Sequence, residues 1–144
     1  MAGPESSPRL FTLEEANKLL PLIRRILKEL RSHRDEVDRL DKETAVEELS
    51  WLQPDGSVNP KARQQVAKLQ KMRKEQRVSF ELSLNDFQKT GAQLKDLDDG
   101  LVDFFASRGK EIIYLCWKEG EDRIRHWHDL ESGFAGRRPL EDLE

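Results

Sequence analysis

The chain contains a single cysteine, Cys116, so no disulfide can form within it. No apolar run approaches the ~18 residues needed to span a bilayer, and we therefore expect no membrane partner. The opening residues MAGPESSPRL lack the apolar core of a secretory signal, which makes the cytoplasm the expected compartment. A net charge of -3 gives no general attraction to nucleic acid. These absences argue against disulfide-stapled, membrane-spanning and strongly basic protein classes.

The length and composition indicate one domain built largely from charged helices. A chain of 144 residues fits a single domain over 1–144, and a domain of that size needs no disulfides to be stable. Charged residues make up 37% of the chain and hydrophobic residues 36%. This balance favours elongated helices with wide solvated faces and a thin core.

The first helical segment is predicted over 11–52, after a short mobile lead over 1–10. Thr12 and Glu15 match a capping box, in which each side chain accepts a hydrogen bond from a backbone N–H of the other residue. Pro21 removes one helical donor and predicts a kink or a restart. Apolar residues recur at steps of three and four, which predicts one buried face of a helix: Ala16, Leu19, Leu20, Ile23, Ile26, Leu27, Leu30, Val37 and Leu40.

A second helix is predicted over 60–91. Residues 46–52 either continue the first helix or form a separate turn, and the Pro-Asp-Gly sequence at 54–56 stops it. Asn59 and Pro60 provide an N-cap with proline at the first helical position, and Gly91 provides the C-terminal cap. The two helices are expected to form an antiparallel hairpin of coiled-coil type.

A change of periodicity after Gly91 predicts a small antiparallel sheet and a loop over 93–140, which makes the fold class α+β. Residues 123–128 fit either a strand or a helix. The expected strands are an edge strand at 95–97, then 101–105 and 111–117, followed by a loop over 132–139.

The second helix carries a basic face that can bind phosphates or complement the acidic first helix. No aromatic side chain interleaves with these cations to stack bases, so we favour the second interpretation. The face contains Lys61, Arg63, Lys68, Lys71, Arg73, Lys74 and Arg77.

A metal site at His126 and His128 is the less economical interpretation of this histidine pair. Glu121 or Asp129 could supply a further ligand beside the two histidines. Zinc, however, needs three or four ligands at fixed geometry, and the sequence does not show that these residues meet. Cys116, like the neighbouring Trp117 and Trp127, is expected to belong to the packed core. No phosphate loop, dinucleotide fingerprint or catalytic serine motif occurs, so the sequence names no cofactor.

Asp103 stands in the apolar segment Leu-Val-Asp-Phe-Phe, where an unpaired buried carboxylate costs several kcal/mol. It must therefore be exposed, paired or functional. A structural salt bridge of Arg137 with Asp103 or with Glu121 is the favoured explanation, since the arginine fork matches a carboxylate. If the site is functional instead, an anionic ligand takes the place of the carboxylate as the partner of Arg137.

The chain resembles the bacterial family catalogued as domain of unknown function 2203. The resemblance is carried by the Phe11–Asn17 start with Leu20-Pro21, by 100–104, by Leu115-Cys116-Trp117 and by Gly120-Glu121, Ile124, Trp127-His128, 133–137 and Pro139. It implies no activity, ligand or catalytic residue. Phe105 and Asp122 replace prolines that are usual or frequent in the family. His128 falls on the family's Trp-His motif and His126 does not, which weakens the paired-histidine metal site.

Four residues remain as one candidate recognition cluster: Asp103, Glu121, His128 and Arg137. The leading hypothesis is a cytoplasmic binding or assembly module that forms homo-oligomers or binds a protein partner and carries this cluster on its sheet. The alternative is an enzyme or a metal-dependent or anionic small-ligand binder, with His128 as proton carrier or ligand. The alternative requires the four side chains to converge on an open concave site.

Overall fold

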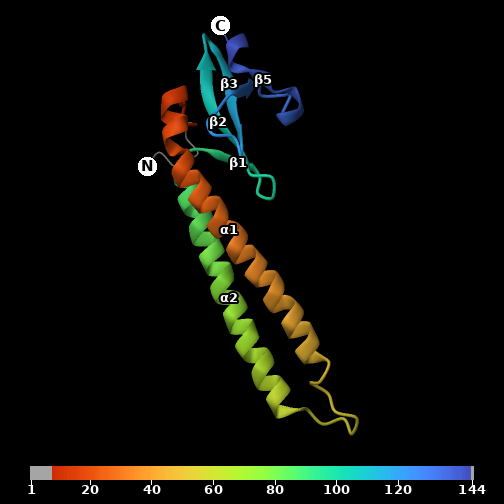
Figure 1. Cartoon of the computed structure of the whole chain (residues 1–144). Coiled ribbons are helices and arrows are strands. Elements are labelled where there is room, and N and C mark those ends of the chain that lie inside the picture. Colours follow the sequence, from red (N-terminus) through yellow and green to blue (C-terminus); the bar gives the residue numbers. More distant parts are fainter. Residues whose placement is uncertain (1–7, 144) are drawn as a thin grey trace. The chain divides into compact units, whose positions relative to one another are not determined.

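The computed structural model describes residues 8–143, so most of the predicted mobile lead lies outside the described residues. Among the described residues, two long helices precede a five-stranded antiparallel sheet, as expected for the α+β class (Figure 1). The described chain divides into a sheet unit, residues 8–27 and 85–143, and a hairpin unit, Lys28–Leu84. The boundary between these units falls within both helices.

Helix α1 spans Leu13–Glu48 and begins at the predicted capping box. The Thr12 N–H donates to Glu15 Oε1 at 2.9 Å, and the Glu15 N–H donates to Thr12 Oγ1 at 3.1 Å. Pro21 lies inside the helix, which continues through it without a restart. The first helical segment, predicted to reach residue 52, is helical as far as Glu48. The residues that follow form a turn, which was the other possibility for 46–52, and Leu52 forms a β-bridge with Val58.

Helix α2 spans Pro60–Lys89 and starts at the predicted cap, where Asn59 Oδ1 accepts from the backbone N–H of Lys61. In the hairpin unit the two helices run side by side (Figure 1), with apolar side chains of both helices buried. Arg73 of the basic face forms an ion pair with Asp41 of α1, so the acidic helix complements the basic one at that point. No helix within 8–143 has the length and apolar character that a membrane crossing requires.

The sheet unit contains five strands that pair in chain order, β1-β2-β3-β4-β5. The segment 123–128, left open between strand and helix, supplies strand β4. The expected loop over 132–139 contains the 3-10 helix η2 and strand β5. The bounds are β1 Gln93–Asp96, β2 Leu101–Arg108, β3 Glu111–Lys118, β4 His126–His128, η2 Phe134–Gly136, β5 Arg138–Pro139 and the final 3-10 helix η3 Leu140–Asp142.

The alternation of side chains gives the sheet two chemically different faces. One face is apolar and lies against the first turns of α1 (Figure 1). Just before α1, the Phe11 ring meets the Phe104 ring edge-on, with 5.2 Å between the ring centroids. The buried residues of this face are Val102, Phe104, Ala106, Ile113, Leu115, Trp117 and Trp127. Trp117 and Trp127 are therefore core residues, as predicted. The opposite face, which we call the polar face, carries Asp103, Cys116 and His128 beside the stacked rings of Phe105 and Tyr114.

Candidate functional site

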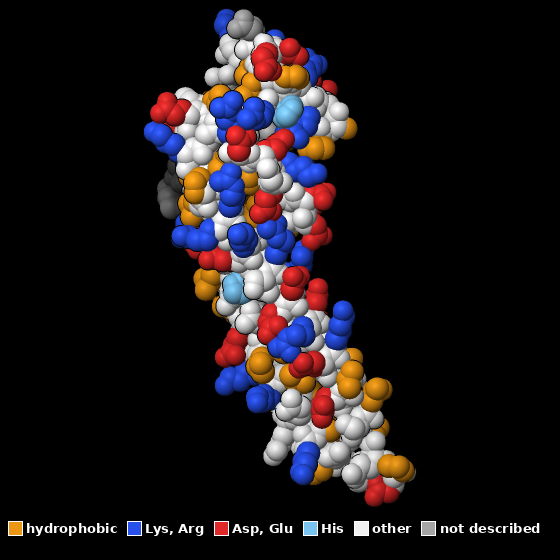
Figure 2. All heavy atoms as spheres, viewed as in Figure 1, with side chains coloured by type: hydrophobic (Ala, Val, Ile, Leu, Met, Phe, Trp, Pro, Cys, Tyr) orange, Lys and Arg blue, Asp and Glu red, His pale blue; other side chains and the backbone are white. Residues whose placement is uncertain are grey.

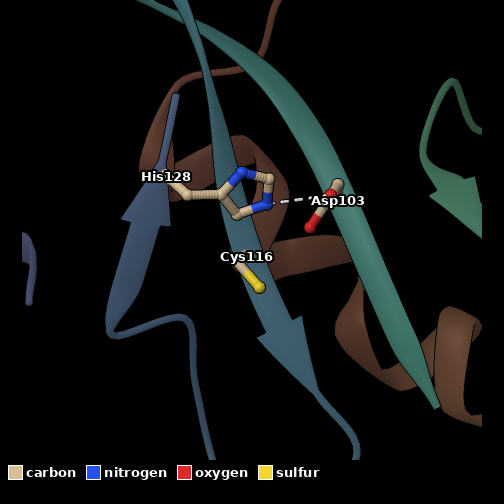
Figure 3. Close-up of side chains that lie close together, drawn as sticks. All are labelled: Asp103, Cys116 and His128. Atoms are coloured by element: carbon tan, nitrogen blue, oxygen red, sulfur yellow. Dashed lines mark hydrogen bonds and ion pairs between the residues drawn. The ribbon is translucent and has the colours of Figure 1, made fainter. Parts of the chain in front are cut away.

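Three polar side chains project from neighbouring strands on the face opposite the apolar core. Asp103 comes from β2, Cys116 from β3 and His128 from β4, and Figure 3 shows them gathered on one side of the sheet. Asp103 stands directly opposite Cys116 in the β2–β3 register, while His128 is paired with Tyr114. The imidazole of His128 therefore crosses β3 to reach Asp103. We call Asp103, Cys116 and His128 the site triad.

The Asp103 carboxylate and the His128 imidazole form a buried pair. His128 Nε2 lies 3.0 Å from Asp103 Oδ2, and only 3% of the His128 side chain and 5% of the Asp103 side chain are exposed. The other ring nitrogen, Nδ1, lies 2.7 Å from the carbonyl oxygen of Asp129. Because a carbonyl can only accept, this network assigns a proton to Nδ1. A second proton is then shared between Nε2 and the carboxylate.

Burial controls the protonation of the triad. It raises the pKa of Asp103, although the nearby His128 and the hydrogen bond from the Cys116 thiol oppose that rise. Burial also raises the pKa of Cys116 to about 12, and the negative charge of Asp103 adds to this increase. Cys116 is therefore a thiol at neutral pH. Since both His128 nitrogens are engaged, no imidazole base is available to activate it as a nucleophile.

The triad borders a pocket of about 220 Å³, which we call the sheet-face pocket. Lys95 and Tyr114 contribute to its wall from the sheet, and Leu130 and Phe134 contribute from the segment after β4. The Tyr114 hydroxyl donates to Gln93 Oε1 at 3.1 Å, and the Lys95 ammonium lies 4.8 Å from the centre of the Tyr114 ring. The buried acid, thiol and imidazole thus share one pocket with an aromatic wall and a nearby cation.

Glu121 and Arg137 form a separate ion pair. Arg137 Nη2 donates to both Glu121 carboxylate oxygens at 2.9 Å and to His126 Nδ1 at 2.8 Å. Glu121 Oε1 also accepts from the backbone N–H of Lys118 at 2.8 Å. We call Glu121, His126 and Arg137 the Arg137 cluster. Because its arginine donates to Nδ1 of His126, that imidazole accepts there and carries its proton on Nε2.

The four residues predicted as one cluster are thus divided into two pairs. Asp103 meets His128 in the site triad, whereas Glu121 meets Arg137 in the Arg137 cluster. The Arg137 cluster comes near the site triad at the backbone of Cys116, whose carbonyl oxygen is 3.5 Å from Arg137 Nη2. Of the salt bridges considered from the sequence, Glu121–Arg137 is the one that forms.

Cys116 is the site residue that the sequence reasoning missed. It is buried, as expected for a core residue, but its side chain lies on the polar face beside Asp103 (Figure 3). The turn at Gly109 contained the missing signal, because a tight turn between 101–108 and 111–118 places Asp103 opposite Cys116. His126 was set aside as a ligand, and it is found bonded to Arg137.

The chain belongs to the family described as uncharacterized conserved protein DUF2203, which matches residues 9–140. No curated protein and no solved structure matches the chain. The family match agrees with the resemblance seen in the sequence, and it carries no description of an activity.

Proposed function

We propose that this protein is a binding module that recognises a small ligand in its sheet-face pocket. The observation that carries the proposal is the convergence of a buried acid, a buried thiol and a buried imidazole on one pocket. Burying polar groups costs free energy unless they are paired, and a purely structural sheet face can be filled by apolar residues instead. A ligand that uses these groups gives their retention a purpose.

The Arg137 cluster would hold the wall of the pocket. The Arg137 guanidinium carbon lies 4.7 Å from the centre of the Phe134 ring, and Phe134 lines the sheet-face pocket. Through its bonds to Glu121, Arg137 ties the segment that contains η2 to the end of β3. In this proposal Asp103 and His128 contact the ligand, and Glu121 and Arg137 position the wall.

The test is a titration of isotope-labelled full-length protein with three small probes, acetate, inorganic phosphate and imidazole, followed by amide NMR. We expect at least one probe to shift the signals of Tyr114, Cys116 and His128 in a saturable manner. The His128→Gln variant should lose that response, whereas His33→Gln, altered in the hairpin unit, should keep it. Shifts spread over the surface, or equal shifts in the His128→Gln variant, would contradict the proposal.

Self-association is a second proposed property, and we assign it to the connecting end of the hairpin unit. Apolar side chains are exposed there, with 65% of Val46, 84% of Leu49 and 68% of Leu52 accessible. Figure 2 shows apolar side chains at this end. A second copy of the chain that covers them would remove this apolar area from water.

Light scattering across a wide concentration range tests this assembly role. We expect a dimer or a larger homo-oligomer that dissociates when Leu49 and Leu52 are replaced by lysine. Replacing Leu82, which is also exposed but lies within α2, serves as the matched control. A wild type that stays monomeric throughout would exclude the assembly role and leave the pocket proposal intact.

We also propose a cytoplasmic location, without nucleic acid as partner. Cys116 is the free cysteine of the chain and is buried, so the fold needs no oxidising compartment. Basic residues of α2 are complemented in part by α1, as the Arg73–Asp41 pair illustrates. Subcellular fractionation tests the location.

A further inference from the structure

The site triad offers three different metal-binding atoms at one point. The carboxylate oxygen of Asp103, the sulfur of Cys116 and an imidazole nitrogen of His128 all lie within 4.8 Å of one another, and all three residues are buried. We propose that the sheet-face pocket binds a transition-metal dication of the zinc class through Asp103, Cys116 and His128. This inference rests on the proposed binding function and names the ligand.

The donor set selects the class of metal. Calcium and magnesium prefer oxygen ligands, whereas a thiolate and an imidazole favour borderline or soft ions such as zinc. Three protein ligands leave a tetrahedral ion with one further position. Since the triad borders a pocket of about 220 Å³, that position can accept water or a small molecule. This arrangement is typical of zinc sites that exchange a ligand.

The surroundings of His128 agree with this assignment. Metal-binding histidines usually donate their second ring N–H to a carbonyl or carboxylate, which fixes the ring and directs the other nitrogen to the metal. Here Nδ1 donates to the Asp129 carbonyl oxygen at 2.7 Å, and Nε2 faces Asp103 at 3.0 Å. The hydrogen bond to Asp129 thus holds Nε2 in the orientation of a ligand.

Charge balance also permits the exchange of protons for a metal. Without metal, the thiol is neutral, and the carboxylate and imidazole with their shared proton have no net charge. A dication bound by a thiolate, a carboxylate and a neutral imidazole again gives no net charge. Binding therefore displaces the thiol proton and the shared proton to solvent without leaving a buried net charge.

The test uses cobalt(II) as a spectroscopic probe on full-length protein purified without chelators and then stripped. We expect one cobalt per chain, a thiolate-to-cobalt charge-transfer band and the visible bands of tetrahedral coordination. Zinc should remove these bands by competition. Cys116→Ala should lose the charge-transfer band, while the matched control His33→Gln, altered in the hairpin unit, should keep it. Circular dichroism checks that both variants are folded.

A second measurement needs no variant. Zinc added to stripped wild type in weak buffer should release about two protons per ion and raise the melting temperature. A cobalt complex without the thiolate band, or a band retained in folded Cys116→Ala, would overturn the metal assignment. If the NMR probes still shift the pocket residues in that case, the binding function stands without the metal. If neither probes nor metal bind there, both proposals fail.

Discussion

Asp103 shows how an acid is tolerated in an apolar strand. It lies on the polar face of β2 and pairs with His128, while the Cys116 thiol donates to it as well. Removing one member of such a pair leaves the other buried without a partner, which is more costly than removing both. The pair should therefore contribute to the free energy of unfolding when no metal is bound, and this contribution can be measured separately from ligand binding.

In chelator-treated protein, Asp103→Ala should lower the free energy of unfolding by about 3–5 kcal/mol, because His128 loses its buried partner. The double variant Asp103→Leu with His128→Leu should recover much of that loss, since neither polar group remains buried. Urea unfolding measures both effects. A single variant that loses less than about 1 kcal/mol would show that the pair is not buried in solution.

Arg137→Lys should weaken the pocket wall even though it retains the positive charge. All the hydrogen bonds to Glu121 and His126 come from Nη2 at the far end of the guanidinium, which also lies over the Phe134 ring. Lysine has no planar guanidinium to lie over this ring and carries its donors on a differently placed ammonium, so it cannot reproduce this set of contacts. We expect a loss of about 1–3 kcal/mol in unfolding free energy, typical of a charged hydrogen bond left unmade.

Weaker probe binding in the NMR titration should accompany the lower stability of Arg137→Lys. The exposed Arg123→Lys serves as the matched control, and both properties should stay close to wild type there. Equal behaviour of the two variants would contradict the positioning role of Arg137.

At the level of elements, the start of α1 depends on the capping box. The backbone N–H of Thr12 donates to the Glu15 carboxylate and lowers its pKa from the ordinary value. A lowered pKa means that the folded state holds the proton less tightly than the unfolded state. The stabilising contribution of Glu15 is therefore present above its unfolded pKa and is lost as the pH falls through its folded pKa.

Glu15→Ala should melt below wild type at neutral pH, and the difference should shrink as the carboxyl group of the wild type is protonated. Glu15→Gln should lie between the two at neutral pH, because an amide oxygen still accepts the hydrogen bond. Thermal unfolding followed over a series of pH values provides the comparison. A difference that is independent of pH would exclude the charged cap as its cause.

The elements could largely be predicted because their signals are local. The Thr12 and Asn59 caps begin the two helices, and the turn glycines separate the strands. The end of α1 was less certain, because the apolar pattern stops at Leu40 and residues 46–52 fit either a helix or a turn; the helix ends at Glu48 and a turn follows. Strand β5 has two residues, too few for any periodicity.

The site could be predicted only in part, because it depends on distances across several strands. The sequence indicated Asp103 and His128 as functional candidates and Arg137 as the partner of an acid. The sequence could not show that the His128 side chain crosses β3 to reach Asp103. Because of this contact, Asp103 and His128 form one pair, and Glu121 and Arg137 form another. Cys116 was missed because burial alone does not reveal which face of a strand a side chain occupies.

At the scale of the whole molecule, each unit has its own proposed role. The sheet unit contains the site triad, its pocket and the Arg137 cluster, and the hairpin unit contains the exposed apolar residues assigned to self-association. Because the two properties rest on different residues, variants of one unit should leave the other property unchanged. The central claim concerns the sheet unit, where we propose that the buried triad binds a transition-metal ion.

The most direct test of that claim is a crystal structure of the wild type purified without chelators and supplied with zinc. We expect one zinc ion about 2.0–2.3 Å from the Asp103 oxygen, the Cys116 sulfur and His128 Nε2, with its remaining coordination position directed into the pocket. Asp103 and His128 that keep their 3.0 Å hydrogen bond, with only water in the pocket, would contradict it.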